Sequence, residues 1–293
     1  MANEQERQFR TLISCSQLAN ALAATDDSDT SNLRIVDCRF DLGDTEAGRR
    51  AYIHSHIPGA AYAHLDEDMS GPILPGRTGR HPLPDPHEFA LTLARLGISN
   101  NAQVALYDAS GGSMASRMWW MLRWVGHEAA AVLDGGWDAW TAAGLPTRSG
   151  VESSQPGSFS ASPRPELVVD AAEMLAKTAS GGALVIDARA ADRFRGENET
   201  HDPIGGHIPG ASNLPHTGNL HDGLFRDPAE LAARFSELMG NRPPSEVIFY
   251  CGSGVSACHN ALALKHAGIG EARLYPGSWS DWITDPARPT SQG

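Results

Sequence analysis

The chain has 293 residues, of which 41% are hydrophobic and 20% are charged, and its formal net charge is −12. This length suffices for two domains, each with its own hydrophobic core. No apolar run approaches the roughly 20 residues that a membrane-spanning helix needs. The acidic balance disfavours broad nucleic-acid binding, and the polar amino terminus lacks the apolar segment of a secretory signal. We therefore expect a cytoplasmic protein that binds neither membranes nor nucleic acid.

The first half of the chain alternates between helix and strand patterns. Ser14 and Gln17 have the spacing of a capping box, which predicts a helix over 18–24. A branched apolar run over 34–39 predicts the next strand. The helix pattern that starts at Asp85 has proline at its first position, which helix starts favour. Two further strand patterns follow, over 103–108 and 130–133.

The second half repeats this alternation. Asp170 and Glu173 again have capping-box spacing, here before a helix over 174–179. A second helix pattern begins at Asp227, and strand patterns lie at 184–189, 246–251 and 271–275. Alternating strands and helices predict the α/β class, with a mainly parallel sheet flanked by helices. Ligands of such folds bind beyond the carboxyl ends of the strands.

The two halves are copies of one unit. The segment "HIPGAA" at His56 recurs as "HIPGAS" at His207, and "IVDCRFDL" at Ile35 recurs in the same order as "VIDARAADRF" at Val185. A stretch rich in Ser, Pro and Gly, residues 147–165, has no periodicity and is typical of a connector. We predict two tandem domains, with boundaries at 10–151 and 152–293.

Cys251 is the candidate nucleophile. It ends the strand pattern "VIFY" and begins the turn "CGSGVSA", which leads directly into a helix pattern. Gly252 and Gly254 let successive backbone N–H groups turn toward one point, and the helix N-terminus adds its dipole. Such a concavity favours an anion and hence a thiolate. The four cysteines form no C-x-x-C pair, so we expect reduced thiols, no zinc site and no disulfide framework.

The first copy carries a carboxylate at the equivalent position. Alignment of "VALYD" with "VIFYC" places Asp108 opposite Cys251. Only the second copy is therefore expected to be catalytic, and the first is an inactive copy. The pairs Asp37 with Arg39 and Asp187 with Arg189 follow equivalent strands, and we interpret both as structural ion pairs.

Together, the duplication, the paired "HIPGA" turns and the loop "CGSGVSAC" resemble the two-domain rhodanese family, and within it the 3-mercaptopyruvate sulfurtransferase branch. The resemblance covers residues 10–286. It implies that Cys251 attacks the outer sulfur of a small-molecule donor and forms a persulfide, which cyanide or a thiol then collects. No metal or organic cofactor is implied. The expected acceptor is a low-molecular-weight thiol or a thioredoxin-like protein, and the expected state is a monomer.

The resemblance also implies roles for other residues. Arg193 matches the family arginine that anchors the donor anion, and backbone N–H groups of the loop would hold the persulfide; the expected substrate-binding residues are Arg193, Gly252, Gly254, Val255 and Ser256. Ser253 and His56 resemble the serine and histidine of a hydroxyl relay, with its acid left open between Asp44 and Glu46. Because "HIPGA" occurs twice, closing a turn is an equally good interpretation of His56.

Donor choice is predicted from the side chains that follow Cys251. Thiosulfate-preferring members have a basic pair there, whereas this chain has Gly252 and Ser253, which leave no adjacent cation and favour 3-mercaptopyruvate. Mercaptopyruvate enzymes usually carry a second arginine some nine residues after the Arg193 position. This chain has none there, and Arg195 or His201 is the candidate substitute.

The alternative function is that of a sulfurtransferase that forms the same persulfide with thiosulfate as donor. A third possible function is that of a non-catalytic persulfide carrier. The turn also matches a dinucleotide fingerprint with Glu271 as the ribose acid, but too little chain follows for the remaining strands and helices. A cysteine phosphatase would need an arginine where Ala257 stands.

Overall fold

The computed structural model describes residues 8–24, 32–153 and 155–293. The chain packs as two units, one formed by residues 1–69 and 85–163, and the other by residues 70–84 and 164–293. The second unit therefore includes a segment, residues 70–84, that lies within the first half of the sequence. The boundary at 151/152 was placed between the two copies of the sequence repeat, and it stays a prediction.

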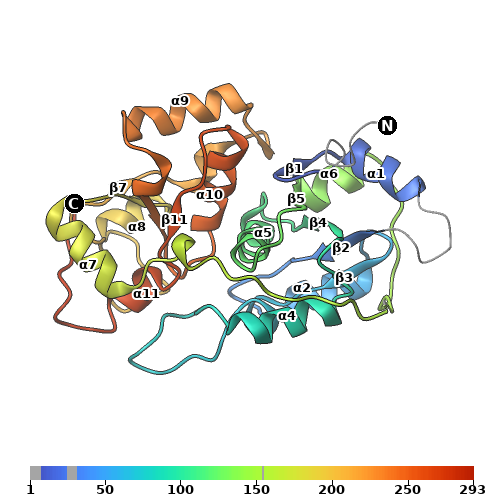
Figure 1. Cartoon of the computed structure of the whole chain (residues 1–293), viewed down its shortest axis with the longest axis horizontal. Helices are drawn as coiled ribbons and strands as arrows, with labels where there is room; N and C mark the ends of the chain where they lie inside the picture. The colour runs from blue at the N-terminus through green and yellow to red at the C-terminus, as the bar shows by residue number, and fades with distance from the viewer. Residues whose placement is uncertain (1–7, 25–31, 154) are drawn as a thin grey trace. The chain divides into compact units, whose positions relative to one another are not determined.

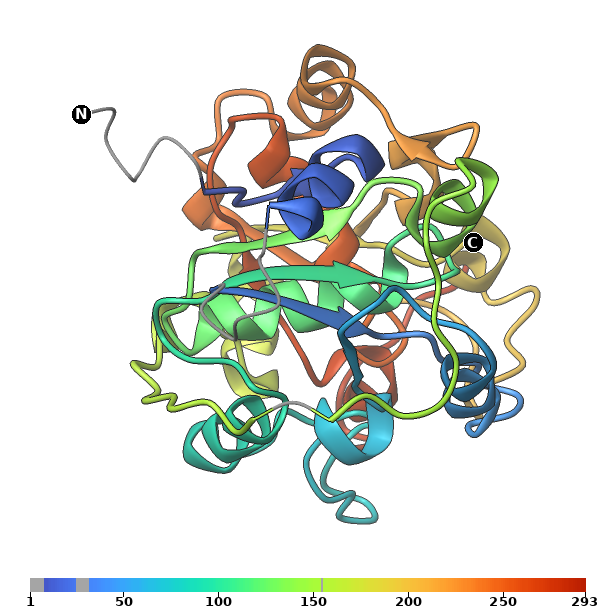
Figure 2. The ribbon, with the colours of Figure 1, turned by 90° about the vertical axis from the view of Figure 1, so that its right-hand side faces the viewer.

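The first unit is built on a parallel sheet of five strands. Its strands lie in the order β1-β5-β4-β2-β3, and every pair is parallel. Figure 2 shows β2, β4 and β5 side by side and pointing the same way. The strands are β1 (Leu12–Ile13), β2 (Leu33–Asp37), β3 (Ala60–Tyr62), β4 (Gln103–Tyr107) and β5 (Ala130–Leu133). The helices are α1 (Cys15–Ala23), α2 (Ala47–His54), α3 (Leu65–Asp68), α4 (Pro86–Arg95), α5 (Ser113–Trp124) and α6 (Gly136–Ala142).

Apolar residues cover both faces of this sheet. Ile35, Ala105 and Tyr107 point to one face, where they pack with Leu18 of α1 and Trp140 of α6. The alternate strand residues, such as Val36 and Leu106, are equally buried. Helix α5 packs against β4 and β5, and all of its residues are buried. Strands buried on both faces explain the continuous apolar runs in the sequence.

The second unit repeats the plan with shorter strands. Its sheet has the order β11-β10-β6-β7, again with parallel pairs throughout. The strands are β6 (Leu184–Asp187), β7 (Ser212–Asn213), β10 (Val247–Tyr250) and β11 (Arg273–Leu274), with a separate antiparallel pair of β8 (Leu220–His221) and β9 (Leu224–Phe225). The helices are α7 (Ala171–Ser180), α8 (Ala191–Arg195), α9 (Pro228–Met239), α10 (Ala257–His266) and α11 (Ser278–Trp282), with short 3-10 turns at η2 (Pro165–Leu167), η3 (His216–Asn219) and η4 (Pro244–Glu246).

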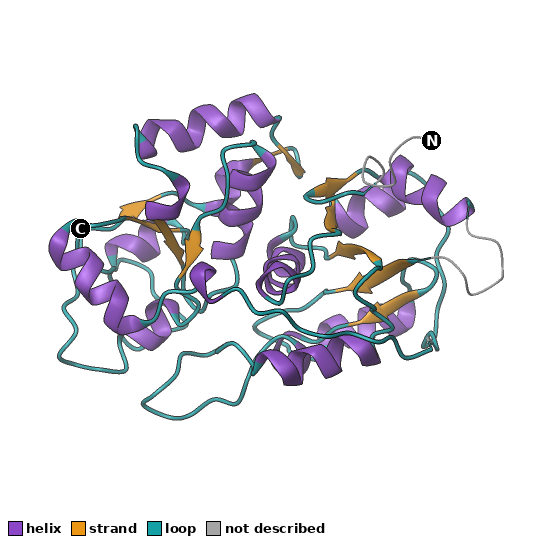
Figure 3. Cartoon of the chain, in the orientation of Figure 1, coloured by secondary structure: helices purple, strands orange, loops and turns teal. Residues whose placement is uncertain are grey.

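Both sheets have helices around them, which confirms the predicted α/β class with mainly parallel sheets (Figure 3). The order β5-β4-β2-β3 of the first unit corresponds to β11-β10-β6-β7 of the second, as the duplication predicts. Helix α10 packs against β10, β11 and α9 (Figure 1). Within the described ranges, every helix is too short or too polar to cross a lipid bilayer.

The helix starts follow the predicted capping chemistry. The Ser14 hydroxyl accepts the N–H of Gln17, and the Gln17 side chain accepts the N–H of Ser14 in return. Asp85 caps α4 by accepting the N–H groups of His87 and Glu88 with its carboxylate. Helices α1 and α7 begin three residues earlier than predicted, because the first turn directly follows the capping residue and needs no apolar side chain.

The predicted ion pairs are confirmed in both units. Arg39 Nε lies 2.9 Å from an oxygen of Asp37, and Arg189 Nη2 lies 2.7 Å from Asp187 Oδ2. All four side chains are buried. The two pairs lie at the carboxyl ends of equivalent strands, β2 and β6. Each pair therefore stabilises the edge of the sheet at which ligands of parallel sheets bind.

Candidate active site

Cys251 directly follows β10, at the carboxyl end of the sheet of the second unit. Its side chain is 2% exposed, and the backbone N–H of Gly254 donates to the sulfur at 3.2 Å. Gly254 has a φ of 78°, and a Cβ on it would lie 2.2 Å from the carbonyl oxygen of Pro276. Only glycine fits there, so the tight turn around the sulfur depends on this residue.

The backbone of the loop is held by the first turn of α11. The N–H of Trp279 donates to the carbonyl of Cys251 at 3.0 Å, and the N–H of Ser280 donates to that of Gly252 at 2.9 Å. The N–H of Cys251 donates to the Ser278 hydroxyl at 3.1 Å. The loop carbonyls are thus tied down on one side of the turn, which fixes the orientation of its peptide planes.

Several loop N–H groups remain available. Among the described residues, no acceptor is found for the backbone N–H groups of Gly252, Ser253, Val255 and Ser256. Buried N–H groups without acceptors are rare in folded proteins. Located at the start of α10 and beside the sulfur, they form a concavity suited to an anion.

The equivalent loop in the first unit is occupied by its own side chain. Asp108, which is fully buried, accepts four backbone N–H groups at 2.7–2.8 Å, those of Ser110, Gly112, Met114 and Ala115. In the first unit, the Asp108 carboxylate therefore occupies the space that the loop N–H groups surround. In the second unit, the Cys251 thiol lies at the start of the equivalent loop.

Two guanidinium groups lie beside the cysteine loop. A Cβ built on Gly252 would lie 3.1 Å from Arg80 Nη2 and 3.4 Å from Arg193 Nη2. The expectation that no cation adjoins Cys251 is therefore wrong. The sequence positions next to the cysteine carry no charge, but Arg80 from the 70–84 segment and Arg193 from α8 supply it through space.

The two residues considered as substitutes for a second arginine lie elsewhere. Arg195 forms an exposed ion pair with Glu197 at 2.6 Å. His201 is exposed, and its backbone N–H donates to Glu199. Neither contact involves the cysteine loop.

Arg193 itself is held by acids of the same unit. Its Nη2 lies 2.7 Å from Glu199 Oε1 and 3.7 Å from Asp202 Oδ2. Burial raises the pKa of Glu199, but hydrogen bonds from Arg193 and from the N–H of His201 outweigh it, so that the pKa lies below its usual value. Glu199 is therefore a carboxylate that fixes the guanidinium beside the loop.

Ser253 has a histidine partner that the sequence analysis missed. His81 Nδ1 lies 2.8 Å from the Ser253 hydroxyl, and both side chains are nearly buried. His56, the predicted relay histidine, is fully buried in the first unit, where Nδ1 bonds to the carbonyl of Tyr52 at 2.8 Å and Nε2 lies 3.4 Å from Glu152.

The two acids considered for His56 also have other partners. Asp44 pairs with Arg50, and Glu46 lies 3.1 Å from Arg49. The contacts of His56 match the turn-closing interpretation, and His207 bonds in the same manner to the carbonyl of Phe194 at 2.9 Å.

The remaining thiols lack such surroundings. Cys38 is buried in the first unit, and burial together with the charge of Asp37 raises the pKa of its thiol well above the usual value. Burial also raises the pKa of Cys15. Cys258 donates its S–H to the carbonyl of Gly254 at 3.3 Å. Glu271, the candidate ribose acid, forms an ion pair with Arg164 at 3.0 Å.

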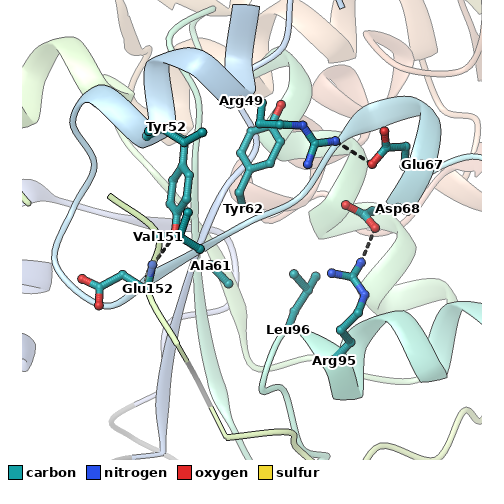
Figure 4. A pocket seen from close by; sticks show the side chains of 11 residues that line it. Arg49, Tyr52, Ala61, Tyr62, Glu67, Asp68, Arg95, Leu96, Val151 and Glu152 are labelled. Atoms are coloured by element: carbon teal, nitrogen blue, oxygen red, sulfur yellow. Dashed lines mark hydrogen bonds and ion pairs between the residues drawn. The ribbon is translucent and has the colours of Figure 1, made fainter. Parts of the chain in front are cut away.

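A pocket of about 510 Å³ in the first unit is lined neither by Cys251 nor by any other residue of its loop (Figure 4). Its two cations, Arg49 and Arg95, point at carboxylates of α3, those of Glu67 and Asp68. No cysteine lines it. This pocket therefore has charges that are already paired and no nucleophile.

One cluster in the described part of the chain has metal-ligand geometry, Glu46, His64 and Glu67, whose ligand atoms lie within 4.8 Å of one another. His64 Nδ1 accepts the N–H of Asp66 at 3.2 Å, so the proton sits on Nε2, which donates to the carbonyl of Thr45 at 2.9 Å. Both ring nitrogens are occupied, and Arg49 binds both glutamates. The cluster is an ion-pair network rather than a metal site.

Arg80 and His81 were not singled out from the sequence because they lie in the first copy. A signal was present, however. The stretch between the "HIPGA" turn and the next Asp-Pro helix start is longer in the first copy, residues 62–84, than in the second, residues 213–226. The extra residues carry the Gly-Arg-His run at 79–81. A polar insertion into one copy of a repeat is a place to look for function.

Comparison with known proteins identifies the family of the chain. The family model for the rhodanese-like domain matches twice, at residues 17–143 and 170–285. A probable 3-mercaptopyruvate sulfurtransferase of Pseudomonas aeruginosa is 49% identical over 284 residues, which cover 96% of this chain and 98% of that protein. A thiosulfate sulfurtransferase of Bos taurus is 33% identical over 298 residues, or 97% of this chain and 96% of that protein. The structure of 3-mercaptopyruvate sulfurtransferase from Leishmania major superposes with a TM-score of 0.82 at 33% identity, covering 96% of this chain and 75% of that one. This chain, with its two matched domains, belongs to the rhodanese family.

Proposed function

We propose that the protein is a sulfurtransferase that moves a sulfane sulfur from 3-mercaptopyruvate, through a persulfide on Cys251, to a thiol or cyanide. The observation that carries this proposal is the loop itself. The Cys251 thiol lies at the start of a loop whose N–H groups find no acceptor among the residues that the structure describes, and Arg80 and Arg193 lie beside this loop. The names of the Pseudomonas and Leishmania relatives support the same donor.

The sulfur transfer requires one bond to form and one to break. The Cys251 thiolate attacks the thiol sulfur of the donor, a sulfur–sulfur bond forms, and the carbon–sulfur bond breaks. The electron pair of that bond goes to the carbon next to the ketone and gives the enolate of pyruvate, which takes up a proton. In the second half-reaction an acceptor thiolate attacks the outer sulfur, and the Cys251 thiolate leaves. The loop N–H groups of Gly252, Ser253, Val255 and Ser256 would bind the outer sulfur of the persulfide.

Ser253 and His81 are suited to supply the proton that the enolate takes up. The 2.8 Å contact between His81 Nδ1 and the Ser253 hydroxyl is short enough for a hydrogen bond. A serine hydroxyl is a weak acid, so it donates a proton efficiently only when a neighbouring group replaces that proton with its own, as an imidazole N–H can. We therefore give His81 the role that the sequence analysis gave to His56.

Thiosulfate is the alternative donor, and one observation favours it. Sulfite, which leaves when thiosulfate is attacked, is a dianion, and two guanidinium groups beside Gly252 would stabilise it. The name of the bovine relative points the same way. A non-catalytic persulfide carrier is the third candidate, because the same loop could hold a persulfide without turnover.

A donor comparison tests the three functions. We expect a higher kcat/KM with 3-mercaptopyruvate than with thiosulfate, measured with the same acceptor and pH, with cyanide and with a dithiol in turn. The reverse order would move the protein to the thiosulfate function. A persulfide that forms on Cys251 and is never released to either acceptor would make it a carrier.

We also propose a compartment, an acceptor and an oligomeric state for the protein. All four cysteines are free thiols, which fits a cytoplasmic protein. A low-molecular-weight thiol or a thioredoxin-like protein would then be the acceptor, and the chain would act as a monomer. Light scattering of the pure protein checks the last point, and a gain of turnover on adding thioredoxin checks the acceptor.

A further inference from the structure

Four consecutive apolar residues are exposed in the segment over residues 70–84. They are Pro72, Ile73, Leu74 and Pro75, and we call them the apolar tip. Ile73 is 60% exposed and Leu74 is 48% exposed. Single exposed aliphatic residues are ordinary on protein surfaces, but a run of four is unfavourable in water unless a partner covers it. The apolar tip therefore marks a surface for binding.

The apolar tip belongs to a closed loop. The N–H of Gly71 donates to the carbonyl of Pro82 at 2.8 Å, which joins the two ends. Within the loop, the N–H groups of Arg77 and Thr78 donate to the carbonyl of Leu74 at 2.9 and 3.1 Å, and the N–H of Leu74 donates to the Thr78 hydroxyl at 3.0 Å. The two prolines of the apolar tip restrict its backbone further. The apolar tip is thus ordered in advance, which reduces the entropy that is lost when a partner binds.

The other arm of this loop is fastened to the support of the cysteine loop. A Cβ on Gly79 would lie 2.5 Å from the Ser280 hydroxyl, and the N–H of Arg80 donates to the same hydroxyl at 3.1 Å. Ser280 belongs to α11, and its own N–H donates to the carbonyl of Gly252 at 2.9 Å. In Figure 1 the segment runs below α11. Because the turn that holds the apolar tip ends one residue before Gly79, the apolar tip lies beside the cysteine loop.

A further exposed aliphatic residue, Ile204, is attached to the same helix. It is 44% exposed, and its carbonyl accepts the indole N–H of Trp279 in α11 at 2.8 Å. Asp202, two residues earlier, forms an ion pair with Arg80. Exposed aliphatic side chains therefore come from two segments that an ion pair joins, and both segments contact the helix that holds the cysteine loop.

The segment with the apolar tip is basic. Residues 70–84 contain Arg77 and Arg80 and no Asp or Glu, although the whole chain has a formal net charge of −12. Arg77 is exposed and follows the apolar tip by two residues. An apolar surface with positive charge at its edge is complementary to a partner surface that is apolar at its centre and acidic at its edge.

The second half of the proposed reaction brings an acceptor to this place. Cys251 is 2% exposed, so an acceptor thiol has to approach closely to reach the outer sulfur. A low-molecular-weight thiol would leave the four apolar residues in water. A protein whose surface extends around its thiol would bury them as the thiol meets the persulfide.

We propose that the apolar tip and Arg77 form the docking surface for a protein acceptor, which presents a reactive thiol on an apolar surface with an acidic edge. The inference rests on the proposed function and adds the place where the acceptor binds. In the transfer, the acceptor thiolate attacks the outer sulfur, a new sulfur–sulfur bond forms, and the Cys251 thiolate leaves.

The first test compares a protein acceptor with a small one. The double variant Ile73→Ser with Leu74→Ser should lower kcat/KM for reduced thioredoxin by about ten- to thirtyfold, because less apolar area is buried on docking. Its kcat/KM for dithiothreitol should change less than about twofold. Leu224→Ser is the matched control, since Leu224 is 45% exposed on β9 of the same unit, and it should change neither value by more than about twofold. Equal losses with both acceptors, or an equal loss in Leu224→Ser, would overturn the inference.

The second test measures the charge at the edge of the apolar tip. With a thioredoxin of acidic net charge, kcat/KM of the wild type should fall as the ionic strength rises. Arg77→Gln should lower kcat/KM at low salt by about three- to fivefold and make it less dependent on salt. Arg242 is a partly exposed arginine of the same unit, and Arg242→Gln should keep the dependence of the wild type. The same salt dependence in Arg77→Gln and the wild type would contradict the assignment of Arg77 to the docking surface.

The third test separates docking from the donor reaction. Sodium polysulfide loads a thiolate with one sulfur without 3-mercaptopyruvate or thiosulfate, and intact mass follows the loss of that sulfur from Cys251 in a single turnover. If the wild type uses neither donor but passes the loaded sulfur to thioredoxin at a rate that the Ile73→Ser, Leu74→Ser variant lowers, the proposed function fails and the docking surface stands. If the loaded sulfur passes to dithiothreitol but never to thioredoxin, the docking surface fails and the sulfurtransferase function stands.

Light scattering tests a different occupant of the apolar tip. We expect the wild type and the Ile73→Ser, Leu74→Ser variant to have the same mass in solution. A wild-type dimer that these two substitutions dissociate would assign the apolar tip to a second copy of the chain and overturn the inference.

Discussion

The loops after β4 and β10 share one backbone plan and differ in what fills it. Both follow a central parallel strand and both lead into a buried helix. In both, the first carbonyl of the loop accepts an N–H from the first turn of the last helix of the unit, that of Asp108 from Trp137 and that of Cys251 from Trp279. In the first unit, the Asp108 carboxylate accepts four N–H groups. In the second, the corresponding loop has N–H groups for which the described residues offer no acceptor. The first loop therefore uses for its own fold the backbone groups with which, in our proposal, the second loop binds an anion.

The frame around each loop has been retained in both copies. Tyr107 donates its hydroxyl to Asp37 at 2.6 Å and accepts the N–H of Ile57, and Tyr250 likewise accepts the N–H of Ile208. Burial is the main reason that the pKa of each tyrosine is raised, so both hydroxyls stay protonated. The copies thus differ in the residue that starts the loop, Asp108 or Cys251, and in the cations beside it, and the prediction that only the second copy is catalytic depends on these differences.

The largest effect is expected from the nucleophile. Cys251→Ser should abolish turnover, by more than about a thousandfold, because serine is not ionised at neutral pH and forms no persulfide. Intact-mass analysis after incubation with donor should show one added sulfur on the wild type, removed by cyanide, and none on the variant. Cys258→Ala is the matched control and should keep both turnover and the added sulfur. Turnover by the serine variant would remove Cys251 from the mechanism.

The second prediction concerns the occupied loop. Asp108→Asn replaces a carboxylate that accepts four N–H groups with an amide whose –NH₂ cannot accept any of them. We expect the free energy of unfolding to fall by about 3–5 kcal/mol, the range for breaking a buried charged network. Urea unfolding measures this change, and the activity per folded molecule should remain close to that of the wild type.

A matched control for Asp108 is available in α6. Asp138 is exposed in the first turn of α6, and Asp138→Asn should change the free energy of unfolding by less than about 0.5 kcal/mol. If both variants unfold with the same free energy, the four hydrogen bonds of Asp108 contribute nothing net, and the proposed division of roles between the two loops is wrong.

The sequence predicts the fold and the nucleophilic loop well, because both depend on local patterns. The alternation of apolar runs and capped helices, the duplication and the Gly-rich turn at Cys251 are all contiguous in the chain. Arg80 and His81 could not be placed in the same way. They reach Gly252 and Ser253 from a segment some 170 residues earlier, and only packing brings such distant residues together. His56 was chosen for its resemblance to the relay histidine of the family, whereas the repetition of its motif already favoured the turn-closing interpretation.

The third prediction compares two serines at equivalent loop positions. Ser253→Ala removes the hydroxyl that His81 contacts, and it should lower the rate with 3-mercaptopyruvate by about ten- to a hundredfold, the usual range for losing a positioned proton donor. The thiosulfate reaction forms no enolate and should fall less. Ser110→Ala in the first unit removes the equivalent hydroxyl and should leave both rates unchanged. Equal losses with both donors would limit Ser253 to a structural part in the loop.

The smallest effect is expected from a second acid beside the buried arginine of the second unit. Arg39 and Arg189 each donate to a backbone carbonyl, that of Ser55 and that of Gly206. Among the described residues, only Arg189 of the two also pairs with a glutamate: Glu199 lies 3.2 Å from Arg189 and 2.7 Å from Arg193. Because the folded-state pKa of Glu199 is lowered, its contribution to stability is present above the ordinary carboxyl pKa and is lost as the pH falls through the folded value. Glu199→Gln should therefore be less stable than the wild type near neutral pH, and the difference should narrow below about pH 4.3. Urea unfolding over that range measures it, with the exposed Glu197→Gln as the control for a surface pair. A gap between wild type and Glu199→Gln that stays constant with pH would show that the carboxylate charge does not stabilise the arginines beside the cysteine loop.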